Sequence, residues 1–260
     1  MRLHAGCELL FETQESAPLI LMLQPQEGAA QRILQASLQV NPQVPTLDYV
    51  DSYGNLCQRL MAPPGHLRVR STITAQVAHH IDVQFGAGFV PVQDLPNATL
   101  PFLLPSRYCQ SDLMADLAHA ITADIEPAYD QVEAIRHWIH THIEYRYDTS
   151  DASTSALDTE KTRVGVCRDF VHLGIALCRS LTIPARMVVG YLYDLKPMDL
   201  HAWFEAYVGH RWYTFDATQP EPRGDRIIIA YGRDAADVAL ATQYGPLQLT
   251  EMEVWVKAVS

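Results

Sequence analysis

Three residue types that together perform acyl transfer occur in order along the second half of the chain. Cys167 lies in the run GVCRDFVHLGIAL, His201 begins the run HAWFEAYV, and Asp216 ends the run RWYTFD. A cysteine thiolate can attack a carbonyl, a histidine can take up and return the proton, and a carboxylate can orient that histidine and stabilise its cation. The three residues therefore predict a nucleophilic triad in which Cys167 carries the acyl group.

The residues around Cys167 favour a reactive thiol. Gly165 and Val166 precede it, and the apolar residues that follow it are typical of a buried helix, so Cys167 is expected in the first turn. Unpaired N–H groups and the helix dipole favour negative charge at that end, and therefore favour the thiolate. We expect the Cys167 N–H to bind an oxyanion, with Tyr145 or Tyr147 upstream as candidates for a second donor.

The segment that begins at His201 predicts a β-hairpin. Aromatic and β-branched residues fill 201–208 and 211–216, with Gly209 and His210 between them. The gap of 15 positions from His201 to Asp216 is consumed by two strands and a short turn. Both side chains are therefore expected near one end of a sheet, with the carboxylate orienting the imidazole.

Each of these residues has an ordinary alternative role. A cysteine in an apolar helix is usually a core residue, a lone histidine is usually structural, and an aspartate that ends a strand usually forms a turn. The ordered set with its flanking aromatic residues favours the triad over three separate coincidences. Cys178, about three turns further along the same helix, is expected in the core.

These blocks resemble the transglutaminase-like superfamily of cysteine enzymes. The segments that carry the resemblance are 165–170, 183–186, 189–191, 201–205, 212 and 216–218. Residues 232–238, and also 21–25, 31–33 and 51–55 in the first third, are similar to its bacterial branch. Ala217 stands where many members carry proline, which leaves the triad untouched.

The resemblance implies an α+β protein with two domains. An N-terminal all-β domain, sandwich or barrel-like, is expected over residues 1–105 with its connector, and a papain-like transglutaminase core of helices packed on an antiparallel sheet over 106–260. Such a protein would perform cysteine-dependent acyl transfer on peptide or amide bonds through a thioester. Hydrolysis by a protease or amidase is favoured; cross-linking to an amine and a non-catalytic peptide-binding module stay open as alternatives.

Local patterns indicate the elements that position the triad. Short strands separated by turns fill the first third, and prolines mark a connector over 91–105. Ser111 is expected to cap one helix and Pro127 to open a second. Residues 149–162 indicate a loop, and the alternation over 252–258 predicts a last strand in the same sheet as the hairpin.

Composition limits the partners and the setting. The chain has 260 residues, 48% of them hydrophobic, and a net charge of −11, which argues against nucleic-acid or anionic membrane surfaces and favours a neutral or cationic peptide or protein substrate. Five scattered cysteines indicate no disulfide framework, and the first ten residues lack a signal-like apolar stretch. We expect a cytoplasmic protein of undetermined oligomeric state.

Metal chemistry is the alternative enzyme class. The histidines at 137, 140 and 142, and the pair at 79 and 80, lack the carboxylate or cysteine spacing of a zinc site. Positive charge near a helix C-terminus is a sufficient reason for the first group. No calcium-loop pattern occurs. We therefore expect neither a metal nor a cofactor.

Overall fold

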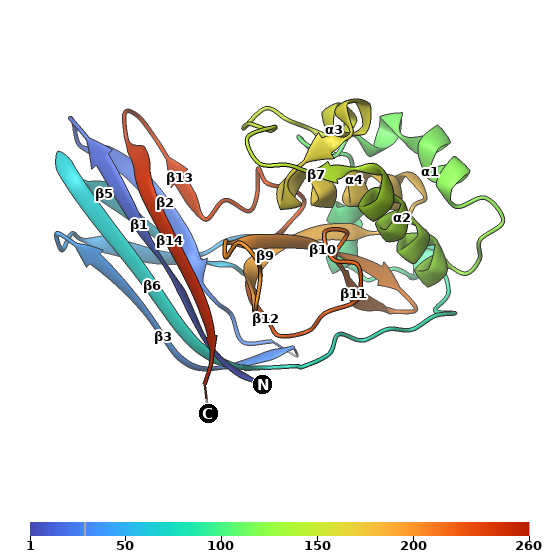
Figure 1. Ribbon diagram of the computed structural model, residues 1–260, viewed down its shortest axis with the longest axis horizontal. Helices are drawn as coiled ribbons and strands as arrows, with labels where there is room; N and C mark the ends of the chain where they lie inside the picture. The colour runs from blue at the N-terminus through green and yellow to red at the C-terminus, as the bar shows by residue number, and fades with distance from the viewer. Residues whose placement is uncertain (29, 260) are drawn as a thin grey trace.

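A computed structural model describes residues 1–28 and 30–259. It shows a β-sandwich beside a unit in which helices cover one face of a separate sheet (Figure 1). This mixed arrangement, with strands in the first third and helices packed on an antiparallel sheet in the second half, confirms the predicted fold class. Within the described residues, no helix is both long and apolar enough to cross a membrane.

The sandwich consists of two four-stranded antiparallel sheets with the strand orders β14-β1-β6-β3 and β13-β2-β5-β4. Alternate side chains of the paired strands point inward, and residues such as Phe11, Leu21 and Val69 are fully buried between the sheets. The strands of the first half are β1 (Arg2–Thr13), β2 (Ala17–Gln24), β3 (Gln31–Asn41), β4 (Thr46–Val50), β5 (Leu56–Ala62) and β6 (Gly65–Val77).

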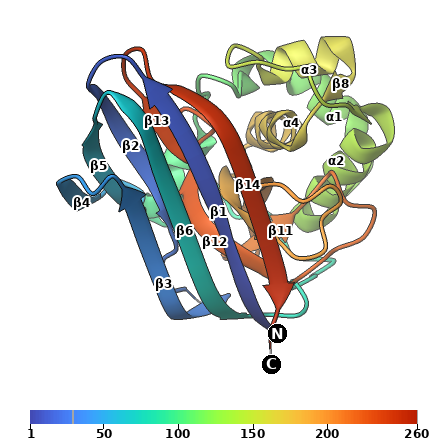
Figure 2. The ribbon, with the colours of Figure 1, turned by 60° about the vertical axis from the view of Figure 1, so that its left-hand side comes forward.

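The last two strands return to the sandwich. β13 (Ala241–Gln243) pairs with β2, and β14 (Gln248–Ala258) pairs with β1 along its length (Figure 2). The predicted strand exists, but its expected place in the sheet of the hairpin is wrong. Alternation specifies a half-buried strand and not its neighbour, and here the open edge of β1 accepts it. The domain boundary near residue 105 stays a prediction.

The second sheet has the order β11-β10-β9-β12 and is antiparallel throughout. Its strands are β9 (Ala185–Leu192), β10 (His201–Val208), β11 (Arg211–Phe215) and β12 (Arg226–Gly232). Helix α4 (Cys167–Ser180) lies against one face, where Phe204 of β10 touches the backbone at Gly174 so closely that a β-carbon there would lie 2.6 Å from its ring. The predicted hairpin is therefore present, and its helix-facing side is apolar.

Three further helices surround α4: α1 (Ala115–Ile121), α2 (Ala128–His142) and α3 (Ala156–Thr162). Pro127 precedes α2 as expected, because its missing N–H costs nothing at a helix start. Ser111 does not cap α1; it begins a 3-10 turn, η3 (Ser111–Leu113), and α1 starts after Met114. The two-residue strands β7 (Glu144–Tyr145) and β8 (Val164–Gly165) pair in parallel. Strand β8 ends two residues before Cys167.

The segment 149–162, expected to be a loop, ends in helix α3. Asp158 accepts hydrogen bonds from the backbone N–H of Ser155 at 2.9 Å and from its hydroxyl at 2.6 Å. Asp158 thus caps the helix start from the third helical position, as the acidic residue of a capping box does. The signal was present in the sequence but was obscured by the many Ser, Thr and Asp residues around it.

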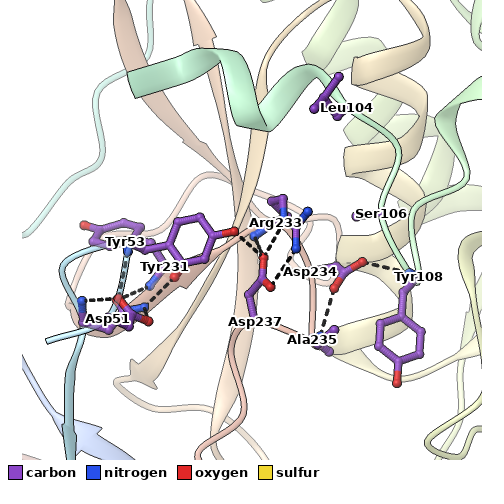
Figure 3. A network of polar contacts seen from close by, with 12 residues as sticks. Asp51, Tyr53, Leu104, Ser106, Tyr108, Tyr231, Arg233, Asp234, Ala235 and Asp237 are labelled. Atoms are coloured by element: carbon purple, nitrogen blue, oxygen red, sulfur yellow. Dashed lines mark hydrogen bonds and ion pairs between the residues drawn. The ribbon is translucent and has the colours of Figure 1, made fainter. Parts of the chain in front are cut away.

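The segment 232–238 joins the sandwich to the second unit. Tyr53 of the sandwich donates its hydroxyl to Asp237 at 2.7 Å, and Arg233 binds the same carboxylate (Figure 3). Asp234 accepts the backbone N–H of Tyr108, which follows the connector, at 2.8 Å. The connector itself contains two 3-10 turns, η1 (Val92–Asp94) and η2 (Asn97–Leu103). The block matched by sequence resemblance is thus a structural joint.

Candidate functional site

Cys167 is the first residue of α4 and is partly exposed, whereas the other four cysteines are buried. Asp169 fixes this helix start by accepting the Val166 N–H at 2.8 Å. Gly165 allows that approach, since a β-carbon on it would lie 2.7 Å from the Asp169 β-carbon. The helix therefore begins at a defined place and presents the thiol at its open N-terminal end.

Arg168, next to the nucleophile candidate, points away from it toward the loop before α3. Its guanidinium donates to the Asp151 carbonyl at 2.5 Å and to the Ser150 hydroxyl at 3.3 Å. Its Nε lies 3.6 Å from the Asp169 carboxylate. Arg168 thus forms an ion pair with Asp169 beside Cys167 and also binds the loop before α3.

The hairpin brings His201 to Asp216. Val208 pairs with Arg211 across the two-residue turn, and both turn residues, Gly209 and His210, have positive φ angles of 54° and 66°. His201 Nε2 lies 2.8 Å from Asp216 Oδ2, and both residues are buried, with 3% and 5% of their surfaces exposed. The spacing in the sequence therefore predicted correctly that Asp216 lies beside His201.

The electrostatics of His201 suit a proton carrier. Burial by itself would lower its pKa, but the Asp216 charge and hydrogen bond, together with a hydrogen bond to the Cys167 side chain, raise the pKa to about 9. With Nε2 engaged by Asp216, Nδ1 is the nitrogen left to face the thiol. His201 thus binds Asp216 directly and also interacts with the Cys167 side chain.

Asp216 is held in its charged form by several donors. Burial would raise its pKa, yet the charges of His201 and Arg226 and the hydrogen bonds it accepts hold the pKa well below its usual range. Arg226 Nη2 lies 2.9 Å from Oδ2, and Thr218 donates its backbone N–H at 3.0 Å and its hydroxyl at 2.7 Å to Oδ1. The carboxylate is therefore fixed in position as well as in charge.

Arg226 is a site residue that the sequence did not reveal. It begins β12, and its guanidinium carbon lies 4.8 Å from the centre of the Trp203 ring. An arginine before the run IIIA is indistinguishable from an ordinary strand end in the sequence. The contact of Arg226 with Asp216 depends on the pairing of β12 with β9, which brings the two residues together.

Of the two candidate tyrosines, Tyr145 is the one beside Cys167. Burial first, and then the charges of Cys167 and Tyr147, raise the pKa of the Tyr145 hydroxyl, which also lies in reach of the Cys167 backbone N–H. Tyr147 packs edge-on against Tyr145, with ring centres 5.4 Å apart. The Tyr145 hydroxyl and the Cys167 backbone N–H thus lie close to each other.

Three of the histidines considered for metal binding have other partners. Nδ1 of His140 lies 3.0 Å from the Ala217 carbonyl, Nδ1 of His142 lies 2.9 Å from the Trp138 carbonyl, and His79 pairs with Asp225 at 2.8 Å. Within residues 1–28 and 30–259, no three His, Cys, Asp or Glu side chains cluster as a metal site would require.

Two family models match the chain. Residues 115–217 match the transglutaminase-like superfamily, and residues 12–78 match the bacterial transglutaminase-like N-terminal region. The first match contains Cys167, His201 and Asp216, and the second covers most of the strands of the sandwich.

Individual proteins resemble the chain over nearly its whole length. The crystal structure of a candidate cysteine protease from Cytophaga hutchinsonii is 39% identical, covers 100% of this chain and 91% of its own, and superposes with a TM-score of 0.93. The uncharacterized protein ML0607 of Mycobacterium leprae is 26% identical over 90% of this chain and 89% of its own length. The uncharacterized protein YebA of Bacillus subtilis is 27% identical over 46% of this chain and 18% of its own length.

Proposed function

Because the chain belongs to the transglutaminase-like superfamily, we propose that it is a cysteine-dependent hydrolase of peptide or amide bonds, with Cys167, His201 and Asp216 as its triad. The observation that carries the proposal is the placement of His201, which is buried between the Cys167 thiol and the Asp216 carboxylate 2.8 Å away. A buried histidine with a raised pKa between a thiol and a carboxylate is suited to general acid and base catalysis.

Before the first half-reaction, Cys167 gives its proton to Nδ1 of His201, and the raised pKa of the imidazole favours this thiolate–imidazolium pair. The thiolate then attacks the carbonyl carbon. The carbonyl π electrons move to oxygen, where the Cys167 N–H and the Tyr145 hydroxyl stabilise the charge. When the tetrahedral intermediate collapses, the C–N bond breaks and Nδ1 gives its proton to the departing amine. The product is a thioester on Cys167.

In the second half-reaction, Nδ1 takes a proton from water and the resulting hydroxide attacks the thioester. The C–S bond breaks, the acid product leaves, and the thiolate–imidazolium pair is restored. In both half-reactions, the Nε2–H of His201 donates its hydrogen bond to Asp216. The Asp216 carboxylate thereby orients the ring and stabilises the imidazolium. Asp216 does not need to accept that proton, because Arg226 and Thr218 favour its charged form.

The triad is tested by selective thiol labelling. Iodoacetamide at substoichiometric concentration should label Cys167 well before the four buried cysteines, and His201→Ala should slow that labelling by about 10-fold or more because the thiolate loses its imidazolium partner. Peptide mapping by mass spectrometry locates the label. Equal labelling of several cysteines that His201→Ala leaves unchanged would contradict the triad.

The acyl acceptor is tested with a peptide library, incubated with and without a primary amine such as cadaverine. We expect cleaved or deamidated products in both conditions, each absent from Cys167→Ala. Incorporation of cadaverine without hydrolysis would replace the hydrolase proposal with a cross-linking transglutaminase. Peptides that bind to the protein but are neither cleaved nor modified would favour a peptide-binding module.

A further inference from the structure

The outer edge of strand β12 is bound by groups of the sandwich. β12 is the end strand of its sheet, whose order is β11-β10-β9-β12. The edge of such a strand carries backbone N–H and C=O groups that need partners where they are buried. Ala78, Gln31 and Asn55 supply partners along this edge. The sequence blocks 31–33 and 51–55 therefore meet the sheet that carries His201.

Gln31, the first residue of β3, binds both backbone polar groups of Ile228. Its Nε2 donates to the Ile228 carbonyl at 2.8 Å, and its Oε1 accepts the Ile228 N–H at 2.7 Å. Nε2 also donates to the Gln26 carbonyl at 2.8 Å, and Gln31 is only 6% exposed. The buried amide thus takes the place of a neighbouring strand at this point of β12.

Asn55 binds Tyr231 in the same way, further along the strand. Its Nδ2 donates to the Tyr231 carbonyl at 2.7 Å, and its Oδ1 accepts the Tyr231 N–H at 2.9 Å. The pairing of β12 with β9 is irregular between Ile228 and Ala230. Such a bulge interrupts the ladder and bends the strand locally. Gln31 and Asn55 therefore hold two separate segments of β12, one on each side of the bulge.

The segment that Gln31 holds carries Arg226. This residue lies two positions before Ile228, and the N–H of its other neighbour, Asp225, donates to the Ala78 carbonyl at 2.9 Å. The backbone of Arg226 is thus held by the sandwich on both sides. From this position its Nη2 lies 2.9 Å from Asp216 Oδ2.

We propose that Gln31 is a positioning residue for the catalytic groups. By fixing the backbone of β12, it keeps the Arg226 guanidinium against Asp216, and Asp216 in turn stays hydrogen-bonded to His201. The inference rests on the proposed triad and gives the sandwich a part in its chemistry. A residue at the start of β3 determines where the carboxylate of the triad lies.

The hydrogen bond between His201 and Asp216 reports this effect without an enzyme assay. The full-length protein is labelled with ¹⁵N-histidine, and the Nε2–H resonance of His201 is identified by its loss in His201→Gln. Gln31→Met keeps the size of the side chain but removes both contacts with Ile228. We expect this variant to speed the exchange of the His201 Nε2 proton with water by about 10-fold or more, because a less firmly held Asp216 opens the hydrogen bond more often.

A milder exchange at the same position guards against loss of the fold. Gln31→Asn keeps the buried amide, but its side chain is one methylene too short to bind both polar groups of Ile228. The exchange rate of the His201 proton should then lie between those of the wild type and Gln31→Met. Gln31→Asn alone carries the test if Gln31→Met does not fold.

Asn55→Leu is the matched control. It also removes two hydrogen bonds to the edge of β12, together with one to the turn before it, so it should lower the urea midpoint at least as much as Gln31→Met. The exchange rate of the His201 proton should nevertheless stay within about twofold of the wild type, because the bulge separates this contact from Arg226.

The route through Arg226 is tested with a double variant. In the Arg226→Met background the guanidinium that links β12 to Asp216 is absent, so Gln31→Met should not change the exchange rate of the His201 proton further. An effect of Gln31→Met as large in this background as in the wild type would overturn the proposal.

Turnover separates this inference from the proposed hydrolase. If the wild type cleaves peptides, Gln31→Met should lower kcat about 10-fold with little change in KM, and Asn55→Leu should leave kcat within about twofold. An inactive wild type with the expected exchange rates would reject the hydrolase and support the positioning role. That role is overturned if both Gln31 variants exchange the His201 proton at the wild-type rate, or if Asn55→Leu speeds the exchange as much as Gln31→Met.

Discussion

His172 and His201 are both buried histidines of the unit that contains the sheet β11-β10-β9-β12, but their surroundings drive their charges in opposite directions. His201 faces the Asp216 carboxylate, which outweighs burial and raises its pKa to about 9. Among residues 1–28 and 30–259, no carboxylate offsets burial at His172: burial, and then the charges of Arg168 and Arg179, lower its pKa to about 3. Burial alone thus predicts neither role, because the neighbouring charge decides whether an imidazole exchanges protons or stays neutral.

The neutral His172 belongs to the structural joint. Its Nε2 accepts the Ala235 N–H at 3.2 Å, and its ring stacks on Tyr108 with centres 4.9 Å apart. One residue before the end of α4, Arg179 donates to the carbonyls of Ala185 and Arg233. Helix α4 therefore serves two purposes: its first residue presents the thiol, and its later turns hold the joint in place.

Exchange of each histidine for glutamine should separate these roles most strongly. His201→Gln removes the proton carrier and should lower turnover by about 1,000-fold or more. His172→Gln keeps an acceptor for the Ala235 N–H and should change turnover by less than about threefold, measured with the same peptide substrate at a temperature where both variants are folded. A comparable loss in both variants would mean that the two histidines are not functionally distinct.

Asp216→Asn should lower turnover by about 100-fold and change its pH dependence. Above about pH 9 the wild-type imidazolium loses its proton, so turnover should fall along an alkaline limb there. Without the Asp216 charge, burial dominates and lowers the His201 pKa, so the limb should move to lower pH.

The matched control for this change is Asp234→Asn. Asp234 is a buried carboxylate that accepts the Tyr108 and Ala236 N–H groups in the joint (Figure 3). Its replacement should leave the alkaline limb where it is in the wild type. An unmoved limb in Asp216→Asn would show that Asp216 does not set the charge of His201.

The two histidines should also affect the pH dependence of stability from opposite sides. The pKa of His172 is lower in the folded chain than its ordinary 6.5, so the unfolded chain takes up the proton first and stability is lost as pH falls from 6.5 toward 3. The pKa of His201 is raised, so its contribution is complete below pH 6.5 and is lost as pH rises through 9.

Urea denaturation across this pH range measures both contributions. His172→Gln should reduce the acid-side loss in the free energy of unfolding by roughly 1 to 3 kcal/mol, and His201→Gln should reduce the alkaline-side loss by a similar amount. The Asp216 contribution, which is lost as pH falls below its ordinary pKa of 3.8, is common to the wild type and His172→Gln. Identical pH profiles for the two variants would refute the opposite pKa shifts.

Sequence reasoning succeeded where local geometry is sufficient. A two-residue turn fixes the register of β10 and β11, so the spacing of His201 and Asp216 was enough to pair them. It failed where the partner is distant in the chain. Neither the alternation of β14 nor the residues around Arg226 specify which strand pairs with each of them. The environment of His172 likewise depends on Tyr108 and Ala235, which are distant from it in the chain.

Two tyrosines extend the comparison to neighbouring hydroxyl groups, with the smallest expected effect. Tyr145 lies beside Cys167, whereas Tyr108 stacks on His172 and donates its hydroxyl to the Ala152 carbonyl at 2.7 Å. If the Tyr145 hydroxyl stabilises the oxyanion, Tyr145→Phe should lower kcat about 10-fold with little change in KM, because the lost hydrogen bond forms only in the transition state. Tyr108→Phe should leave kcat within about twofold and cost about 1 kcal/mol of stability.

Equal kcat values for the Tyr145→Phe and Tyr108→Phe variants would assign the oxyanion to the Cys167 N–H without help from Tyr145. A rise in KM alone for Tyr145→Phe would place this residue in substrate binding instead.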